Sequence, residues 1–187
     1  MIQRELLHMA VTDELTGAFN RNHMNSALAH EMARDRRYSK AFGLLIVDID
    51  YFKKINDSFG HAVGDKVLLK TAQVLSRSIR SSDTLVRWGG EEFVIIAVEI
   101  DEKALHQLCE NLRVSIETTH YDSVDKVTVS IGATLFSKND TQDRLLLRAD
   151  RALYEAKEKG RNRIAYKIED SDLDIINSTP DRPGSSL

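Results

Sequence analysis

Two adjacent glutamates that follow a pair of glycines are the residues best suited to chemistry. Glu91 and Glu92 come directly after Gly89 and Gly90, and residues 93–98 then form an uninterrupted apolar run of strand length. Two glycines between β-prone segments predict a tight hairpin, because Gly reaches the φ > 0 conformations that a two-residue turn requires. Successive strand residues point to opposite faces, so both glutamates cannot decorate one solvated face. A hairpin with a charged rim is the simplest interpretation of these residues alone.

A second acidic segment follows residues 42–47, which have the pattern of a buried strand. Asp48 and Asp50 lie two positions apart and project to the same side if the strand continues through them. Two carboxylates held together in this way repel each other unless a cation lies between them. In the alternative that we favour, Asp50 caps a helix that begins at residues 51–56, and Asp48 alone faces a ligand.

The position of these acids at strand ends predicts a metal site. If the strand that ends at Asp48 lies beside the strand that begins at Glu91 and Glu92, their carboxylates meet at one edge of the sheet. Oxygen ligands of this kind hold Mg²⁺, with phosphate completing the shell. Two metal ions beside a phosphoryl group can activate an attacking hydroxyl and neutralise a leaving pyrophosphate.

The elements that position these acids mix strands and helices without a strict alternation. This order indicates an α+β fold, in which helices pack against an antiparallel-containing sheet. Asn20 is expected to cap the first full helix and Gly160 to end the last one. The expected helices cover residues 20–38, 51–58, 63–79, 102–118 and 140–159, and the expected strands cover residues 42–47, 84–88, 93–98, 126–136 and 161–166.

Three segments are expected along the chain. Residues 1–12 have apolar residues at helical spacing and are interpreted as the end of a signalling linker helix, with a fraying chain end as the alternative. Residues 13–167 are expected to form one domain that begins with a turn at residues 13–17. Residues 168–187 lose the apolar pattern and are expected to form a flexible tail.

Composition argues against several classes of protein. A net charge of −3 argues against a general nucleic-acid binder. The single cysteine, Cys109, excludes an internal disulfide and a cysteine zinc site, and a buried structural thiol is expected there. No apolar run reaches the ~18 residues of a membrane span. We therefore expect a cytoplasmic domain without membrane contact, although an upstream region could anchor a longer protein.

Six ordered sequence blocks resemble the GGDEF domain family, the catalytic domains of diguanylate cyclases. The resemblance covers about residues 12–166, and six blocks with family spacing are far more specific than the glycine–glutamate signature alone. Glu91 stands where the family's name has Asp, which keeps one carboxylate at that position. The blocks are DELTGAFNR (13–21), DIDYFKKIND (48–57), FGHAVGD (59–65), RWGGEEF (87–93), VSIGA (129–133) and ADRALYEAKEKGRN (149–162).

The resemblance implies a fold similar to nucleotidyl cyclases and polymerase palms, with a central mixed sheet wrapped by helices. It also implies a Mg²⁺-dependent reaction, with Mn²⁺ as an alternative ion, in which two GTP molecules condense to cyclic di-GMP and release two pyrophosphates. Each domain would hold one GTP, so the implied active form is a homodimer with two facing half-sites. The upstream sensory domain that usually drives dimerisation is absent from this chain, which is therefore expected to be largely monomeric and weakly active.

The family pattern assigns roles to the acidic residues. Asp48 and Glu91 match the family's metal-binding carboxylates, and the backbone carbonyl of Ile49 is a further expected ligand. Glu92 matches an acid that binds metal or assists deprotonation of the 3′-hydroxyl. Either role suits a carboxylate beside Mg²⁺, because the metal lowers the pKa of a bound hydroxyl.

Other matches concern the nucleotide. Asn56 and Asp65 match the guanine-reading residues, because an amide and a carboxylate can pair with a guanine edge in a way that adenine cannot satisfy. Without the resemblance they would be interpreted as a helix cap and an acid in the first turn of a helix. The remaining matches are the phosphate-binding cations Lys157 and Arg161, the backbone amides of Tyr51, Phe52 and Lys53, and the glycines Gly89 and Gly90, which would let phosphate and ribose approach the backbone.

Arg80 and Asp83 match the family's Arg-x-x-Asp inhibitory site, where cyclic di-GMP binds as a stacked dimer. An arginine reads guanine through a bidentate fork, and an aspartate accepts from ring N–H groups. A surface ion pair would be the default interpretation of the pattern alone. Asn111 occupies the position where a partner arginine is expected, and Arg113 is the nearby candidate, so weaker product inhibition is one expected consequence.

Two other functions remain open. A catalytically quiet GGDEF module could bind GTP or cyclic di-GMP as a receptor. Such members typically lose a metal-binding acid or a signature glycine, whereas this chain keeps them. Another Mg²⁺-dependent nucleotide cyclase or polymerase-like enzyme is disfavoured by the paired guanine readers Asn56 and Asp65.

Overall fold

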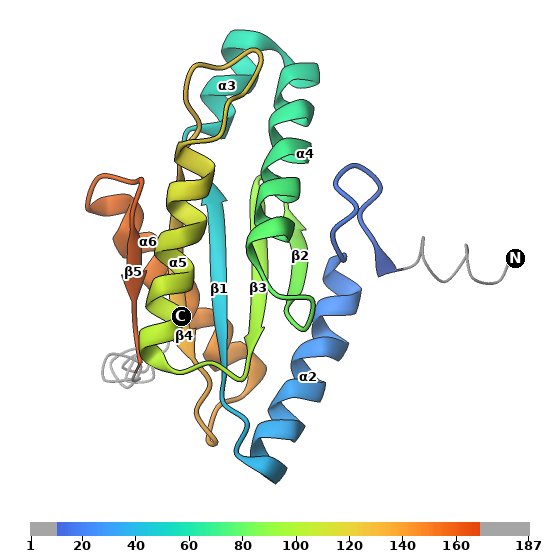
Figure 1. The fold of residues 1–187 in the computed structure, drawn as a ribbon, viewed down its shortest axis with the longest axis vertical. Helices are drawn as coiled ribbons and strands as arrows, with labels where there is room; N and C mark the ends of the chain where they lie inside the picture. The colour runs from blue at the N-terminus through green and yellow to red at the C-terminus, as the bar shows by residue number, and fades with distance from the viewer. Residues whose placement is uncertain (1–10, 169–187) are drawn as a thin grey trace, which may run out of the picture.

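A five-stranded sheet with the strand order β2-β3-β1-β4-β5 lies at the centre of the computed structural model (Figure 1). The structure describes residues 11–168, so most of the expected linker helix (1–12) and of the expected tail (168–187) lies outside the described residues. The strands are β1 (Phe42–Ile49), β2 (Thr84–Gly89), β3 (Glu92–Val98), β4 (Val129–Leu135) and β5 (Ile164–Tyr166), and the helices are α2 (Arg21–Tyr38), α3 (Phe52–Phe59), α4 (His61–Ser78), α5 (Glu102–Glu117) and α6 (Gln142–Glu158).

The sheet is mixed, with β1 as its middle strand. β1 pairs antiparallel with β3 on one side and with β4 on the other. β2 pairs antiparallel with β3, and β5 pairs parallel with β4. All residues of β1 are buried, which explains why its sequence is an almost continuous apolar run. The expected α+β, palm-like fold with a mixed sheet is confirmed.

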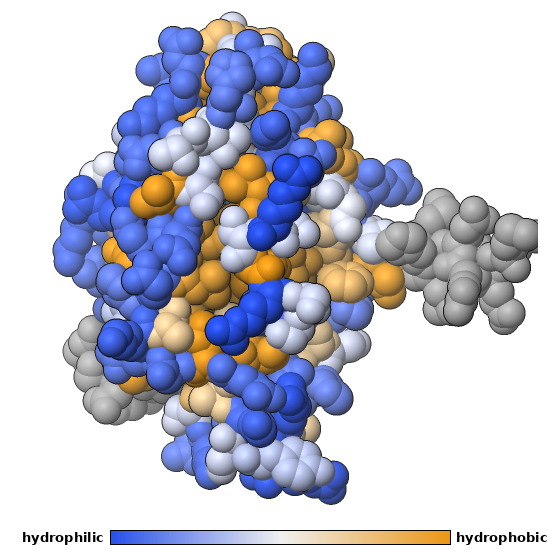
Figure 2. Space-filling model, viewed as in Figure 1, coloured by the Kyte–Doolittle hydropathy of each residue, from blue (hydrophilic) through white to orange (hydrophobic). Residues whose placement is uncertain are grey.

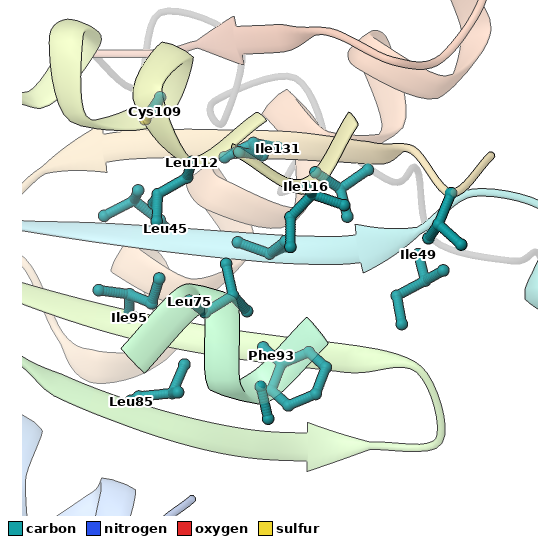
Figure 3. Packing of buried hydrophobic residues seen from close by; sticks show 14 of the residues in the cluster. Leu45, Ile49, Leu75, Leu85, Phe93, Ile95, Cys109, Leu112, Ile116 and Ile131 are labelled. Atoms are coloured by element: carbon teal, nitrogen blue, oxygen red, sulfur yellow. The ribbon is translucent and has the colours of Figure 1, made fainter. Parts of the chain in front are cut away.

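Alternate residues of β1 belong to two separate hydrophobic cores. Leu45 and Val47 pack in the core that α3, α4 and α5 cover, and Figure 3 shows this core from close by. Leu44 and Ile46 pack on the opposite face, against residues of α2 and α6. Because strand side chains alternate, Asp48 belongs to the α2–α6 face. The apolar pattern thereby fixes the side of the sheet on which this carboxylate lies.

Capping side chains and one glycine define several helix ends. Asn20 Oδ1 accepts a hydrogen bond from the His23 N–H at 3.1 Å, so the predicted cap of α2 is confirmed. Asp101 and Thr141 cap α5 and α6 in the same way. Gly60 has a φ of 85° and separates α3 from α4, where the sequence predicts a break.

The predicted turn before α2 is attached to the edge of the sheet. Gly17 has a φ of 72°, and Asp13 Oδ1 accepts from the backbone N–H of Thr16 at 2.9 Å and from its hydroxyl at 2.6 Å. Phe19 then forms an isolated bridge with Val86 in β2. The turn is therefore attached to the strand that leads into the glycine hairpin.

Two expectations from composition can be compared with the structure. Cys109 is fully buried, and burial raises the pKa of its thiol to about 12, as expected for a structural cysteine. Within residues 11–168, no helix combines the length and the apolar character needed to cross a membrane. The face in Figure 2 is largely hydrophilic, and apolar residues show through along its middle, where α4 and α5 lie.

Candidate active site

The two acidic segments meet at one end of the sheet. Asp48 lies directly opposite Glu92 in the β1–β3 ladder, and the Ile49 N–H donates to the Glu91 carbonyl at 3.3 Å. The two strands are therefore neighbours, which is the condition that the predicted metal site requires. Directly opposite residues of an antiparallel pair have Cβ atoms about 4.5–5.5 Å apart and point to the same face. The side chains of Asp48 and Glu92 consequently share the α2–α6 face of the sheet.

Burial and neighbouring charges make ionisation of this pair difficult. Asp48 is 6% exposed, and its Oδ2 lies 2.8 Å from Lys157 Nζ in the last turn of α6. Burial raises the pKa of Asp48 to about 6, with Glu91 and Glu92 adding to the rise and Lys157 opposing it. Burial also raises the pKa of Glu92; Lys157 opposes this rise, and Asp150 and Glu91 add to it. A cation bound here would relieve the repulsion among these carboxylates.

The donor set fits a hard divalent cation. Carboxylate and backbone carbonyl oxygens are the ligands that Mg²⁺ prefers. In the part of the chain that the structure describes, no group of three or more His, Cys, Asp or Glu side chains is arranged to hold a metal by itself. Mg²⁺ in nucleotide enzymes is commonly bound through one or two carboxylates, with substrate phosphates and water completing the shell. Asp48, Glu92 and their neighbours meet that requirement.

Asp50 does not cap the following helix, so the expected capping role is wrong. Its carboxylate accepts hydrogen bonds from Thr128 Oγ1 at 2.7 Å, from Ser130 Oγ at 2.6 Å and from the Asn162 N–H at 2.9 Å. The helix begins one residue later than a cap at Asp50 requires, and Asp50 is turned towards β4 and towards the chain that leads into β5. Asp50 therefore joins the end of β1 to β4 and to the turn after α6.

The start of α3 has no side-chain cap. Tyr51 is the N-cap residue, with φ 57° and ψ 28°, and its side chain makes no capping hydrogen bond. The first backbone N–H groups, which include those of Phe52 and Lys53, are thus left for another acceptor. The Arg161 guanidinium lies over the Tyr51 ring, 4.7 Å from its centroid. This contact brings one of the expected phosphate-binding cations to the start of α3.

The predicted hairpin is present, but its glycines do not have the expected backbone conformation. Neither Gly89 nor Gly90 has a left-handed φ, and the ladder instead shifts register between Arg87 and Gly89. Arg87 closes the turn through Nε and Nη2, which donate to the Gly90 carbonyl at 3.2 and 2.9 Å, and its Nη1 donates to Asp13 Oδ1 at 3.1 Å. A Cβ added at either glycine would meet open space, so a ligand can approach this backbone closely.

The two expected guanine readers lie on neighbouring helices. Asn56 is half-buried on α3, and Asp65 is exposed in the first turns of α4. Asn56 Oδ1 is buried and has no hydrogen-bond partner among the described residues. Gly64, the residue before Asp65, lies against this amide. The pair therefore offers one unpaired acceptor and one exposed carboxylate.

The turn after α6 carries the second expected phosphate-binding cation in an unusual conformation. Gly160, Arg161 and Asn162 have φ values of 114°, 62° and 45°. Left-handed conformations cost free energy in non-glycine residues and persist where surrounding contacts hold them. Here the Asn162 N–H donates to Asp50 Oδ2, and Asn162 Oδ1 accepts from Arg113 Nη1 at 2.9 Å. Gly160 follows the last helical residues, as predicted.

Arg80 and Asp83 lie in the turn between α4 and β2. Asp83 Oδ2 accepts from the Arg80 N–H at 2.9 Å, and its Oδ1 accepts from the Val98 N–H at 3.1 Å, so this carboxylate ties the turn to β3. Both residues also line a surface hollow of about 620 Å³, together with Arg77 and residues 16–19. The geometry is compatible with a ligand there, and the inhibitory role stays a prediction.

Arg113, the candidate partner of that site, belongs to a different group of residues. Its guanidinium bonds to Glu110, to Glu117 Oε2 at 2.7 Å and to Asn162 Oδ1. Hydrogen bonds from Lys126, Arg113 and Asn162 lower the pKa of Glu117 to about 2. The structure thus uses Arg113 to support the turn after α6, and none of its recorded contacts reaches Arg80 or Asp83.

Three contributors to the site lie outside the residues that the sequence patterns single out. Arg87 joins the turn at Asp13 to the hairpin, Asn162 fixes the turn that carries Arg161, and Asp150 adds negative charge near Glu92. All three lie inside the family-like blocks, which is the signal that could have found them. Their partners are distant along the chain, so no local pattern reveals the contacts.

Comparison with known proteins gives one consistent result. The family model "Diguanylate cyclase, GGDEF domain" matches residues 10–163. The probable diguanylate cyclase DgcT of Escherichia coli K12 is 38% identical over 176 residues, which are 91% of this chain and 37% of that relative's length. The coiled coil and GGDEF domain of DgcB from Caulobacter crescentus, in complex with c-di-GMP, superimposes with a TM-score of 0.84 at 28% identity and covers 89% of this chain and 90% of that one. The diguanylate cyclase SiaD from Pseudomonas aeruginosa, in complex with its activator SiaC, gives a TM-score of 0.83 at 31% identity and covers 89% and 65%. The chain belongs to the diguanylate cyclase GGDEF domain family.

Proposed function

We propose that this domain condenses two GTP molecules into cyclic di-GMP and two pyrophosphates. The observation that carries the proposal is the direct opposition of Asp48 and Glu92 at the end of the sheet, beside Lys157. Two acids with raised pKa values next to a lysine form a site for a cation and a polyphosphate together. The relatives named as diguanylate cyclases support this reaction.

Asp48, Glu91, Glu92 and the Ile49 carbonyl would hold Mg²⁺, or Mn²⁺ in its place. The bound ion would lower the pKa of the attacking 3′-hydroxyl and neutralise charge on the departing pyrophosphate. Glu92 lies at the same end of the sheet, directly opposite Asp48, and its carboxylate can accept a proton. It would receive the 3′-hydroxyl proton as the α-phosphate is attacked.

The phosphates would be held by cations and backbone amides around the same sheet end. The amides at the start of α3, from Tyr51 to Lys53, are not used by a capping side chain and would donate to phosphate oxygens. Lys157 would exchange its contact with Asp48 for a phosphate, and Arg161 lies next to the start of α3. These groups would orient the α-phosphate for attack.

Guanine would bind between α3 and α4. Asn56 and Asp65 would pair with its edge, since the unpaired Asn56 Oδ1 needs a donor and the Asp65 carboxylate can accept from ring N–H groups. Adenine presents a different arrangement of donors and acceptors and would leave these groups unsatisfied. The site would therefore select GTP over ATP.

Each domain would provide half of the reaction site. Gly89 and Gly90 are exposed and surrounded by open space, so a second domain carrying its own GTP could approach the hairpin. Catalysis would then require a homodimer in which each 3′-hydroxyl attacks the α-phosphate of the other GTP. Activity would rise more steeply than in proportion to protein concentration wherever the dimer is a minor species.

Cyclic di-GMP would inhibit the enzyme by binding at Arg80 and Asp83. Support comes from the hollow that both residues line and from the c-di-GMP-bound structure of the relative DgcB. Asn111 stands where a second arginine would be expected, and Arg113 is engaged elsewhere. The inhibition would consequently be weak.

The reaction is tested by incubating the chain with GTP and Mg²⁺ at high protein concentration and separating the products by chromatography. The proposal expects one cyclic di-GMP for every two pyrophosphates and no cyclic product from ATP. Equal turnover of ATP would indicate another nucleotide cyclase. Tight binding of GTP or cyclic di-GMP without any product, even after dimerisation is forced, would indicate a receptor and would contradict the proposed activity.

A further inference from the structure

Gly64 occupies a helix position where its backbone does not require glycine. It lies in α4, three residues after the helix begins, and its φ is not left-handed. Glycine is also the least favourable ordinary residue for a helix interior apart from proline. A residue that weakens a helix without serving its backbone needs a reason in its surroundings.

The side chain of Asn56 supplies that reason. A Cβ added at Gly64 would overlap Asn56 Oδ1 far inside van der Waals contact, and its next neighbours would be Asn56 Cγ at 3.0 Å and Phe52 Cζ at 3.2 Å. The severe overlap falls on the end of a flexible side chain and not on backbone. An alanine here could be accommodated by movement of the Asn56 amide, with the two helices still packed.

The same amide oxygen lacks a hydrogen-bond partner. Asn56 Oδ1 is buried and unpaired among the described residues, which is rare for a buried polar atom. The missing Cβ of Gly64 therefore leaves room for the Asn56 amide oxygen, which accepts no hydrogen bond from the described residues.

We infer that Gly64 is a positioning residue for base selection. Because it has no side chain, the Asn56 amide can lie against α4 in the position from which it recognises guanine. The inference rests on the proposed function, since it concerns the same nucleotide site. It adds that discrimination between guanine and adenine depends on a residue that need not touch the base.

The test measures nucleotide binding to the Gly64→Ala variant by calorimetry in Mg²⁺. The probes are 3′-deoxy-GTP and 3′-deoxy-ATP, which lack the attacking hydroxyl and therefore report binding alone. We expect the affinity for 3′-deoxy-GTP to fall about 10-fold or more, as for a lost hydrogen bond in a desolvated site, and the affinity for 3′-deoxy-ATP to stay unchanged. The melting temperature should not fall, because alanine favours the helix.

A double-mutant cycle separates positioning from direct contact. In an Asn56→Ala background the overlapped amide is gone, so Gly64→Ala should fold and should weaken 3′-deoxy-GTP binding no further. The same additional loss in that background would overturn the inference, because alanine would then clash with the base itself. If Gly64→Ala alone fails to fold, the test is the double variant with Asn56→Ala. Failure of that double variant to fold would also overturn the inference.

Gly43→Ala is the matched control. Its Cβ would come within 2.7 Å of Leu105 Cδ1, again a flexible side-chain end, but at the opposite end of β1 from Asp48. This variant should keep the guanine preference. A wild-type chain without that preference would overturn the proposed function and the inference with it. If the wild type prefers guanine and Gly64→Ala keeps that preference, the inference is overturned and the proposed function stands.

Discussion

Asp48 and Glu92 are directly opposite residues of neighbouring antiparallel strands, and Asp48 is ion-paired with Lys157 at 2.8 Å. The strand pattern places both carboxylates on one face, and α6 delivers the lysine to the same place. Like charges held this close destabilise the fold unless a cation balances them. The arrangement therefore places two carboxylates and a lysine together at one end of the sheet, where folding stability should depend on their charges.

Asp48 should make the metal-free protein more stable as the pH falls from about 7 to about 4. Its folded pKa of about 6 lies above the ordinary value of 3.8, so between these values the folded state binds more protons than the unfolded state. Stability is then lost as pH rises through the folded pKa, by roughly 2–3 kcal/mol. In chelator, urea unfolding should find Asp48→Asn more stable than wild type at pH 7.5, with a smaller difference at pH 4.5. A difference that does not change with pH would contradict the raised pKa.

Arg87→Lys should loosen the hairpin and the turn before α2 together. Lysine keeps the charge but cannot bond the Gly90 carbonyl and the Asp13 carboxylate with one planar group. We expect a loss of about 1–2 kcal/mol in unfolding free energy and a lower rate of cyclic di-GMP formation. Thermal unfolding and product assays measure the two effects. Arg77→Lys, at an exposed position on α4, is the control and should change stability little. Unchanged stability in Arg87→Lys would show that the link between turn and hairpin is unimportant.

Asp50→Ala should weaken GTP binding, although Asp50 itself is not expected to contact the nucleotide. The substitution leaves the Ser130 hydroxyl and the Asn162 N–H without their acceptor, and the left-handed turn at Arg161 loses its support. We expect a stability loss of roughly 3 kcal/mol and a raised KM for GTP, with a smaller effect on kcat. Thr128→Val removes one donor to the same carboxylate and should cost less. If neither variant had a raised KM for GTP, the turn at Arg161 would keep its conformation without Asp50.

The features predicted correctly from the sequence are those whose causes lie within a few residues. The apolar run of β1 reflects burial on both faces, and the Asn20 cap depends on a donor three positions away. The adjacency of Asp48 and Glu92 is a condition that the sequence leaves open and that the pairing of β1 with β3 meets. The family-like blocks single out the same acids, and their catalytic roles stay a prediction.

The features predicted wrongly or missed depend on contacts that no local pattern in the sequence reveals. The partners of Asp50 lie 80 and 112 positions away, at Ser130 and Asn162, so a local helix signal made it resemble a cap. The hairpin closes through a register shift and through Arg87, so the glycines do not need a left-handed φ. The contact of Gly64 with the Asn56 amide is visible only once α3 and α4 are packed together.

The most direct measurement compares cyclic di-GMP formation by the wild-type chain with formation by Glu92→Gln and Asp48→Asn. Each variant is fused to the same dimerising coiled coil and supplied with saturating GTP and Mg²⁺. Removing a carboxylate that accepts the proton or holds the metal should lower the rate at least about 100-fold, while circular dichroism remains that of the folded domain. Wild-type rates in both variants would contradict the claim that the facing carboxylates of β1 and β3 form the catalytic centre.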